Sequence, residues 1–211
     1  MKEWLEQFVL AVRGAFGQRV RFIGIQGSRG RGEGTARSDI DAVVVLDALT
    51  YADLKTYDAA ISALPEREKI CGFISGEAEL RNWDRADLFQ FYHDTTPLAG
   101  SLAWMEPLIT AADVRRAVHT GACNLYHGCA HNAVHEKSVE LLDGLCKAAT
   151  FVLRAKHYCE TGEYVGRKDD LAACLCGEDL EILRLGASDA DFDARSKRLL
   201  DWAAGLIRRY A

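Results

Sequence analysis

Residues 24–46, with the sequence GIQGSRGRGEGTARSDIDAVVVL, constrain the fold more than any other stretch of this chain. An apolar run over residues 20–25 leads into this stretch, and a second apolar run, 42–46, closes it. Four of the twelve residues 27–38 are glycine and most of the others are polar, so no regular element is expected there. The pattern therefore predicts two buried strands joined by a polar, glycine-rich loop.

Two carboxylates open the second predicted strand. Asp39 and Asp41 are two residues apart, so both side chains are expected to project from one face of the strand. Carboxylates held that close repel each other unless a cation lies between them, and oxygen ligands of this kind suit Mg²⁺. Gly27 allows the backbone to approach a phosphate closely, and Ser28 offers an N–H and a hydroxyl as donors. The combination predicts a metal and phosphate site, whereas each part alone would equally fit a solvated surface loop.

The charge distribution favours a small anionic ligand. The net charge of −5 argues against a non-specific nucleic-acid surface, because such a surface needs a clustered positive field. The basic residues that do cluster, Arg29, Arg31 and Arg37, all lie in the glycine-rich loop. No apolar run approaches the roughly 18 residues of a membrane span, and the N-terminus lacks the order of a signal peptide. We therefore expect a cytoplasmic protein whose seven cysteines are reduced core residues.

The spacing of apolar residues predicts an α+β fold in two parts. An α/β domain with a short mixed sheet is expected over residues 1–108, and a helical domain over 109–211. In the first part the strands are predicted at 19–25, 39–46 and 69–75, and the helices at 3–16, 51–64 and from Asp84, with an ordered loop or edge strand at 94–100. After a capping box that starts at Thr110, helices are predicted at 111–135, 138–160, within 168–185, and at 189–210.

The opening motif resembles a known signature. Gly27-Ser28, ten further residues, and then Asp39-Ile40-Asp41 before a hydrophobic strand is similar to the motif of the polymerase β-type nucleotidyltransferase superfamily. The order of elements resembles its small members, such as the aminoglycoside (kanamycin-type) nucleotidyltransferases. The resemblance implies that Gly27 and Ser28 hold a nucleoside triphosphate and that Asp39 and Asp41 are catalytic metal ligands. Mg²⁺ and ATP or another nucleoside triphosphate are the expected cofactor and substrate, with Arg29 and Ser38 as further nucleotide-binding residues.

Members of that family generally place a third carboxylate on the next strand, facing the first two. The strand predicted at 69–75 contains no acid. Glu77 and Glu79 follow it directly and could reach in, and Glu79 is our predicted third metal ligand, although acids beside a turn are more often merely solvated. Other candidates for this role are Asp94, Glu136 and Glu140.

Three histidines are spaced by four residues in the helical part. His127, His131 and His135 would share one face of a continuous helix, where they could ligate a metal, move a proton or contact a substrate phosphate. They would equally serve as a polar stripe that packs against other elements. The glutamate of a zinc-hydrolase H-E-x-x-H motif is absent, so that activity is not expected.

These observations predict a Mg²⁺-dependent nucleotidyltransferase that moves a nucleoside monophosphate, AMP from ATP, to a hydroxyl of a small molecule or a protein. Asp39, Asp41 and the metal would stabilise in-line attack on the α-phosphorus, with pyrophosphate as the leaving group. The alternative is a catalytically silent nucleotide-binding or antitoxin-like module that retains the fold without the third acid. Nucleic acid and membrane are not expected as partners, and a homodimer is left open.

Overall fold

A computed structural model describes all residues, 1–211, and the chain forms two compact units. The first unit contains residues 1–84 and 91–108, and the second contains residues 85–90 and 109–211. The first is built around a mixed β-sheet and the second is entirely helical, which confirms the predicted α+β fold class.

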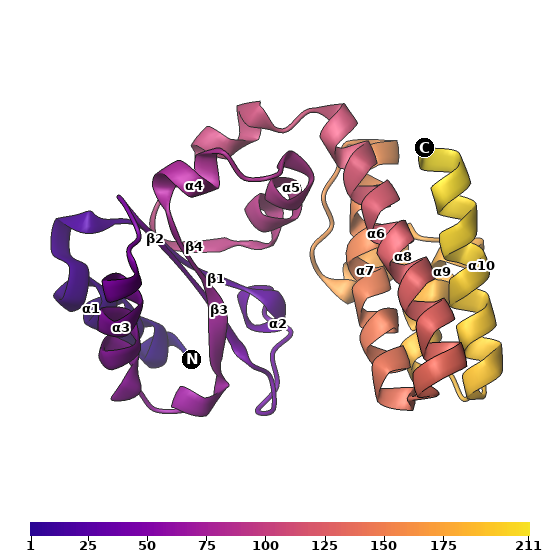
Figure 1. Ribbon diagram of the computed structural model, residues 1–211, viewed down its shortest axis with the longest axis horizontal. Helices are drawn as coiled ribbons and strands as arrows, with labels where there is room; N and C mark the ends of the chain where they lie inside the picture. Colours follow the sequence, from indigo (N-terminus) through magenta and orange to yellow (C-terminus); the bar gives the residue numbers. More distant parts are fainter. The chain divides into compact units, whose positions relative to one another are not determined.

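The sheet of the first unit has four strands in the order β3-β2-β1-β4 (Figure 1). The central strand β1 is antiparallel to both of its neighbours, whereas β2 and β3 are parallel. The two central strands carry the apolar runs of the sequence, and their inner residues are buried on both faces. The bounds of the strands are β1 Val20–Gln26, β2 Ile40–Leu46, β3 Ile70–Gly76 and β4 Thr96–Gly100. The short edge strand predicted within residues 94–100 is thus β4.

Helix α1 (Lys2–Phe16) and helix α3 (Tyr51–Ser62) pack side by side against one face of the sheet (Figure 1). The buried stripe of α1 repeats every four residues, because one helical turn returns a side chain to the same face. Its Trp4 also donates a hydrogen bond from Nε1 to the carbonyl of Pro65, at 2.8 Å. The remaining helices that begin in this unit are short: α2 Gly27–Gly30 and α4 Glu77–Arg81, with 3₁₀ turns at Gly17–Arg19, Arg67–Lys69 and Ala103–Leu108. The expectation that residues 27–38 contain no regular element is wrong for the single helical turn of α2.

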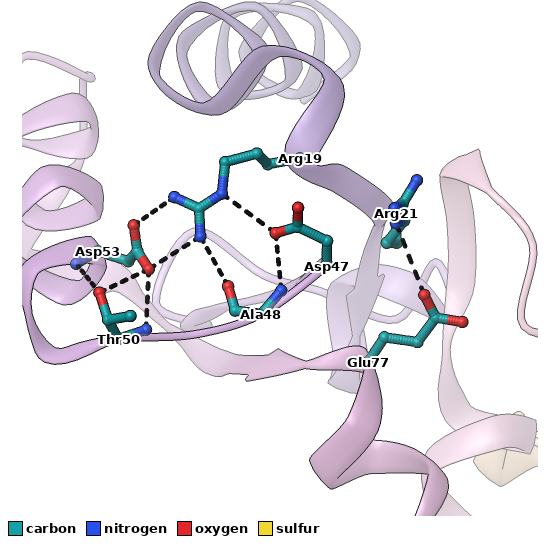
Figure 2. A network of polar contacts seen from close by, with 7 residues as sticks. All are labelled: Arg19, Arg21, Asp47, Ala48, Thr50, Asp53 and Glu77. Atoms are coloured by element: carbon teal, nitrogen blue, oxygen red, sulfur yellow. Dashed lines mark hydrogen bonds and ion pairs between the residues drawn. The ribbon is translucent and has the colours of Figure 1, made fainter.

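One arginine joins three segments at the end of the sheet where β1 starts (Figure 2). The guanidinium of Arg19 forms a two-point contact with the Asp53 carboxylate, at 2.6 and 3.0 Å, and donates from Nε to Asp47 at 3.1 Å. Asp53 is also the third residue of α3, where it completes a capping box with Thr50. The network therefore ties the start of β1 to the end of β2 and to the first turn of α3.

These contacts hold the pKa of the Asp53 carboxyl well below its usual range, chiefly through the hydrogen bonds from Arg19 and then those from Thr50. A carboxyl whose pKa is lowered by folding stabilises the protein above its ordinary pKa of about 4, and this stabilisation is lost as the pH falls.

We predict that Asp53→Asn lowers the urea midpoint at neutral pH and flattens the loss of stability between about pH 4 and pH 2, because the group that titrates is gone. Urea unfolding followed by circular dichroism across that range measures both effects. Asp58→Asn, on the same helix at a solvent-exposed ion pair, is the matched control and should leave the profile as in the unaltered protein. An equal loss of stability with falling pH in Asp53→Asn and in the unaltered protein would contradict the assignment.

The second unit is a helical bundle whose three long helices, α6, α7 and α10, pack around one apolar core (Figure 1). Two shorter helices lie between α7 and α10 in the sequence, which confirms the short helical pieces predicted within 168–185. Residues 85–90, the first part of helix α5 (Arg85–Asp94), complete this unit. The bounds are α6 Ala111–His131, α7 Val139–Thr161, α8 Lys168–Cys174, α9 Gly177–Arg184 and α10 Phe192–Tyr210.

The turn between α6 and α7 is closed by one buried asparagine. The side chain of Asn132 accepts from the backbone N–H of Ser138 at 3.0 Å and donates to the Ser138 carbonyl at 2.9 Å. A π-helical turn, Asn132–Glu136, precedes Lys137, whose φ of 52° places it in the left-handed region. The Asn132 amide thus makes both hydrogen bonds that a paired backbone residue would make, and the chain reverses within six residues.

All seven cysteines are free thiols. Cys129 and Cys146 are buried in the helical core, as predicted, and burial raises the pKa of Cys129 to about 11. The expectation that every cysteine fills a core position is wrong, because Cys71, Cys159 and the pair at residues 174 and 176 are exposed. No helix of the chain combines the length and the apolar character that a membrane crossing requires.

Candidate functional site

The close approach of Gly27 to Asp41 defines the candidate site. Strand β1 ends at Gln26, which pairs with Asp41 of β2, and Gly27 then turns the chain with a φ of 67°. A Cβ built on Gly27 would lie 2.0 Å from the Oδ2 atom of Asp41, far closer than any real side-chain contact. The position therefore requires glycine twice over, for its backbone conformation and for the space taken by the carboxylate.

The two aspartates of the motif lie at alternate positions. Asp39 is exposed directly before β2, Asp41 is half-buried within it, and Ile40 between them is fully buried in the core beneath α1. Since successive side chains of a strand point to opposite faces, both carboxylates project from the face away from α1. This is the arrangement that the sequence predicts for them.

The glycine-rich loop is tied back to β2 by Arg29. Its guanidinium donates to the Ser38 carbonyl from Nε at 3.0 Å and from Nη2 at 2.8 Å, and to the Asp39 carbonyl at 3.1 Å. The hydroxyl of Ser38 in turn accepts from the N–H of Thr35 at 3.0 Å. Arg29 and Ser38, both predicted as nucleotide-binding residues, thus order the loop that leads from Ser28 to the aspartates.

A third carboxylate reaches the site from the other side of β1. Asp94 ends helix α5 just before β4, and it is only 8% exposed. Its Oδ2 accepts from the backbone N–H of Gly27 at 3.3 Å, and its Oδ1 forms an ion pair with Arg31 at 2.6 Å. Gly27 is therefore flanked by Asp41 on one side and by Asp94 on the other.

Arg31 connects the loop to this third acid. Besides Asp94, its guanidinium contacts the carboxylate of Glu33 at 2.8 Å. Burial alone would lower the pKa of Arg31, but the hydrogen bond that it donates to Glu33 and the charge of Asp94 outweigh burial and raise it. Arg31 is thus a fixed positive charge between two carboxylates, and it holds the loop against the start of β4.

The structure does not bring Glu79 to the aspartates, which corrects its prediction as the third metal ligand. Glu79 lies in α4 with its carboxylate beside Gly76, and Gly76 pairs with Leu46 at the end of β2. Asp41, near the start of β2, pairs instead with Cys71. From Asp41 to Leu46 the strand advances about 16 Å, well beyond the reach of a shared ion. Glu77 is likewise engaged elsewhere, 3.6 Å from Arg21 (Figure 2).

No group of three histidine, cysteine or acidic side chains is close enough to hold a metal ion. The carboxylates of Asp39 and Asp41 are oxygen donors of the kind that Mg²⁺ takes where water and substrate phosphate complete its shell. His127, His131 and His135 are exposed in the second unit, with adjacent ring centroids 6.2 and 4.9 Å apart. They share one side of the helix, as predicted, without forming a three-ligand site.

The sequence and the fold both match known nucleotidyltransferases. Residues 5–89 match the family model described as "Nucleotidyltransferase domain", and this segment contains Gly27, Ser28, Asp39 and Asp41. This part of the chain is therefore similar to nucleotidyltransferase domains, and the resemblance drawn from the motif is confirmed. The sequence has no significant match among curated proteins.

A solved structure with the same fold is the spectinomycin adenyltransferase AAD(9) from Enterococcus faecialis, which was crystallised with ATP and spectinomycin. The alignment covers 99% of each chain with a TM-score of 0.59, at 13% sequence identity. The helical unit is thus part of the shared fold, together with the sheet. At this level of identity the likeness concerns the fold alone.

We predict that Gly27→Ala destabilises the protein more than Gly32→Ala. Both glycines have positive φ, which costs an alanine about 1–2 kcal/mol, but a Cβ at Gly32 meets open space whereas one at Gly27 displaces Asp41. Urea unfolding of both variants measures the difference. Equal losses of unfolding free energy would show that the Asp41 carboxylate does not constrain this turn.

Proposed function

We propose that this protein is a Mg²⁺-dependent nucleotidyltransferase that moves a nucleoside monophosphate, AMP from ATP, to a hydroxyl of a small molecule or a protein. One observation carries the proposal: within the segment that matches the nucleotidyltransferase model, the turn at Gly27 lies so close to Asp41 that a Cβ there would be 2.0 Å from its Oδ2 atom. The similarity in fold to an adenyltransferase crystallised with ATP supports the choice of nucleotide.

In this proposal each residue of the site has a distinct role. Asp39 and Asp41 hold Mg²⁺, which would neutralise charge on the triphosphate and on the leaving pyrophosphate. The backbone of Gly27 and the hydroxyl and N–H of Ser28 donate to the triphosphate. Because Arg29 fixes the carbonyls of residues 38 and 39, it positions the first aspartate and need not touch the nucleotide.

We expect Asp41→Asn to abolish Mg²⁺-dependent nucleotide turnover while the fold survives, because the amide keeps the shape of the carboxylate and removes its charge. Pyrophosphate release and calorimetric titration with ATP and Mg²⁺ measure the two consequences. Glu79→Gln is the matched control. Glu79 lies beside the end of β2, about 16 Å along the strand from Asp41, so its substitution should leave both quantities unchanged. Turnover at the level of the unaltered protein in Asp41→Asn would refute the assignment.

Asp94 is proposed as a positioning residue. Both of its oxygens already accept contacts, one from Gly27 and one from Arg31, so its carboxylate fixes the turn and the loop that follow β1. A general base, in contrast, would act on the acceptor hydroxyl in the transition state and would affect turnover more than binding.

Asp94→Asn should therefore raise the Kd for Mg²⁺·ATP by on the order of tenfold, or about 1.4 kcal/mol, and should raise KM more than it lowers kcat. Arg31→Gln breaks the same ion pair from the other side and should reproduce the effect. A collapse of kcat with an unchanged Kd for Mg²⁺·ATP would instead assign Asp94 as the base.

A catalytically silent nucleotide-binding module is the second candidate. The observation that favours it is that Asp41 pairs on β3 with Cys71, which is not an acid. Calorimetry with ATP and Mg²⁺, alongside pyrophosphate release across candidate hydroxyl acceptors, separates the two functions. Binding without release, for every acceptor and divalent metal tried, would identify the silent module.

A further inference from the structure

The proposed transfer reaction gives no role to three exposed histidines near the end of α6. His127 and His131 lie on α6, and His135 lies in the π-helical turn Asn132–Glu136 that follows it. All three side chains are exposed, and their rings contact one another along one side of the helix. Imidazole nitrogen is a preferred ligand of Ni²⁺, Cu²⁺ and Zn²⁺, whereas Mg²⁺ prefers oxygen. The stripe therefore offers a different donor chemistry from the two aspartates of the candidate site.

The distances between the rings distinguish one pair from the other. The centroids of His131 and His135 are 4.9 Å apart, and those of His127 and His131 are 6.2 Å apart. An ion that is about 2.0–2.1 Å from an imidazole nitrogen lies roughly 3.2 Å from the centre of that ring, so two rings that share the ion at an angle of about 100° have centroids roughly 5 Å apart. Rings 6.2 Å apart would need an angle of about 150°, which is wider than neighbouring ligands of a tetrahedral or octahedral ion make. His131 and His135 are therefore the pair that can share one ion.

The backbone holds this pair where α6 changes into the turn before α7. His131 is the last residue of α6, and His135 lies within the π-helical turn. Between them, the buried side chain of Asn132 fixes the turn through its two hydrogen bonds to the backbone of Ser138. The two imidazoles can thus bind an ion by rotation of exposed rings, while the backbone that carries them stays in place.

The number of ligands restricts the kind of ion. No third histidine, cysteine or acidic side chain is close enough to complete a three-ligand group. Structural zinc sites have four protein ligands, so two imidazoles do not form one. The pair suits a divalent ion that prefers nitrogen to oxygen and keeps water in its remaining positions, as Ni²⁺ and Cu²⁺ can.

We propose that His131 and His135 form a two-imidazole site for a nitrogen-preferring divalent transition-metal ion. The ion joins the end of α6 to the turn that leads into α7, and it therefore stabilises this hairpin when it is bound. The site stands independently of nucleotide transfer, because both ligands belong to the second unit, whereas Asp39 and Asp41 belong to the first.

Calorimetric titration of the full-length chain, without any added histidine tag, tests the proposal with Ni²⁺ as the probe. The titration is made in a large excess of Mg²⁺, which occupies oxygen ligands and does not compete for imidazole. The tightest Ni²⁺ site should bind one ion per chain under these conditions. No saturable binding of Ni²⁺, or its displacement by Mg²⁺, would overturn the proposal.

Three variants of the same stripe locate the site. His131→Gln and His135→Gln each leave a single imidazole and should weaken Ni²⁺ binding by about tenfold or more, because the second ligand no longer binds within the same chain. His127→Gln is the matched control: it makes the same change at an exposed position one turn away and should leave the affinity unchanged. Equal losses in all three variants would indicate an adventitious ion only and would refute the site.

Thermal unfolding followed by circular dichroism tests the effect on the hairpin. The unfolding midpoint of the unaltered protein should rise with the concentration of Ni²⁺, because an ion that binds the folded state shifts the equilibrium towards it. His127→Gln should show the same rise, and His135→Gln should show little or none. A rise of equal size in His135→Gln and in the unaltered protein would place the stabilising ion elsewhere and would contradict the proposal.

Discussion

The contact between the Gly27 backbone and the Asp41 carboxylate is the constraint on which the site depends. It follows from the pairing of Gln26 with Asp41, because that register places Gly27, the first residue after β1, against the Asp41 side chain. Neither strand can slip by one residue without turning its buried side chains to the opposite face. The apolar cores of β1 and β2 therefore fix the geometry of the polar site at their ends, and burial supplies the rigidity that a preorganised site requires.

The motif itself was predictable from sequence, because its chemistry is local. Gly27, Ser28, Asp39 and Asp41 lie within fifteen residues, and alternation along one strand is enough to place both carboxylates on one face. The strands and most helices were equally accessible, since long apolar periodicity dominates their formation. The segment that matches the nucleotidyltransferase model, residues 5–89, contains all four of these residues.

The third acid was not predictable in this way, because its position depends on strand direction. β3 runs parallel to β2, so the acids that follow β3, including Glu79, are carried to the far end of the sheet from Asp41. β4 runs antiparallel to β1, so Asp94, two residues before β4, is returned to the end of β1 where Gly27 lies. Proximity in sequence favoured Glu79, whereas sheet topology favours Asp94. Neither direction can be inferred from the apolar pattern of a single strand.

The pairing of β1 with β4 also has a consequence for the order in which the protein assembles. Ile25 pairs with Thr96 across about 70 residues, so this part of the sheet must close a long loop of chain before it gains any stabilisation. The hairpin of α6 and α7 needs to close only a short loop, because Asn132 reverses the chain within six residues. Helical hairpins with such local contacts form early in folding, whereas sheets with distant partners form late. When the complete chain refolds, the contact of Asp94 with Gly27, which depends on the pairing of β1 with β4, is thus expected to form after the hairpin of α6 and α7.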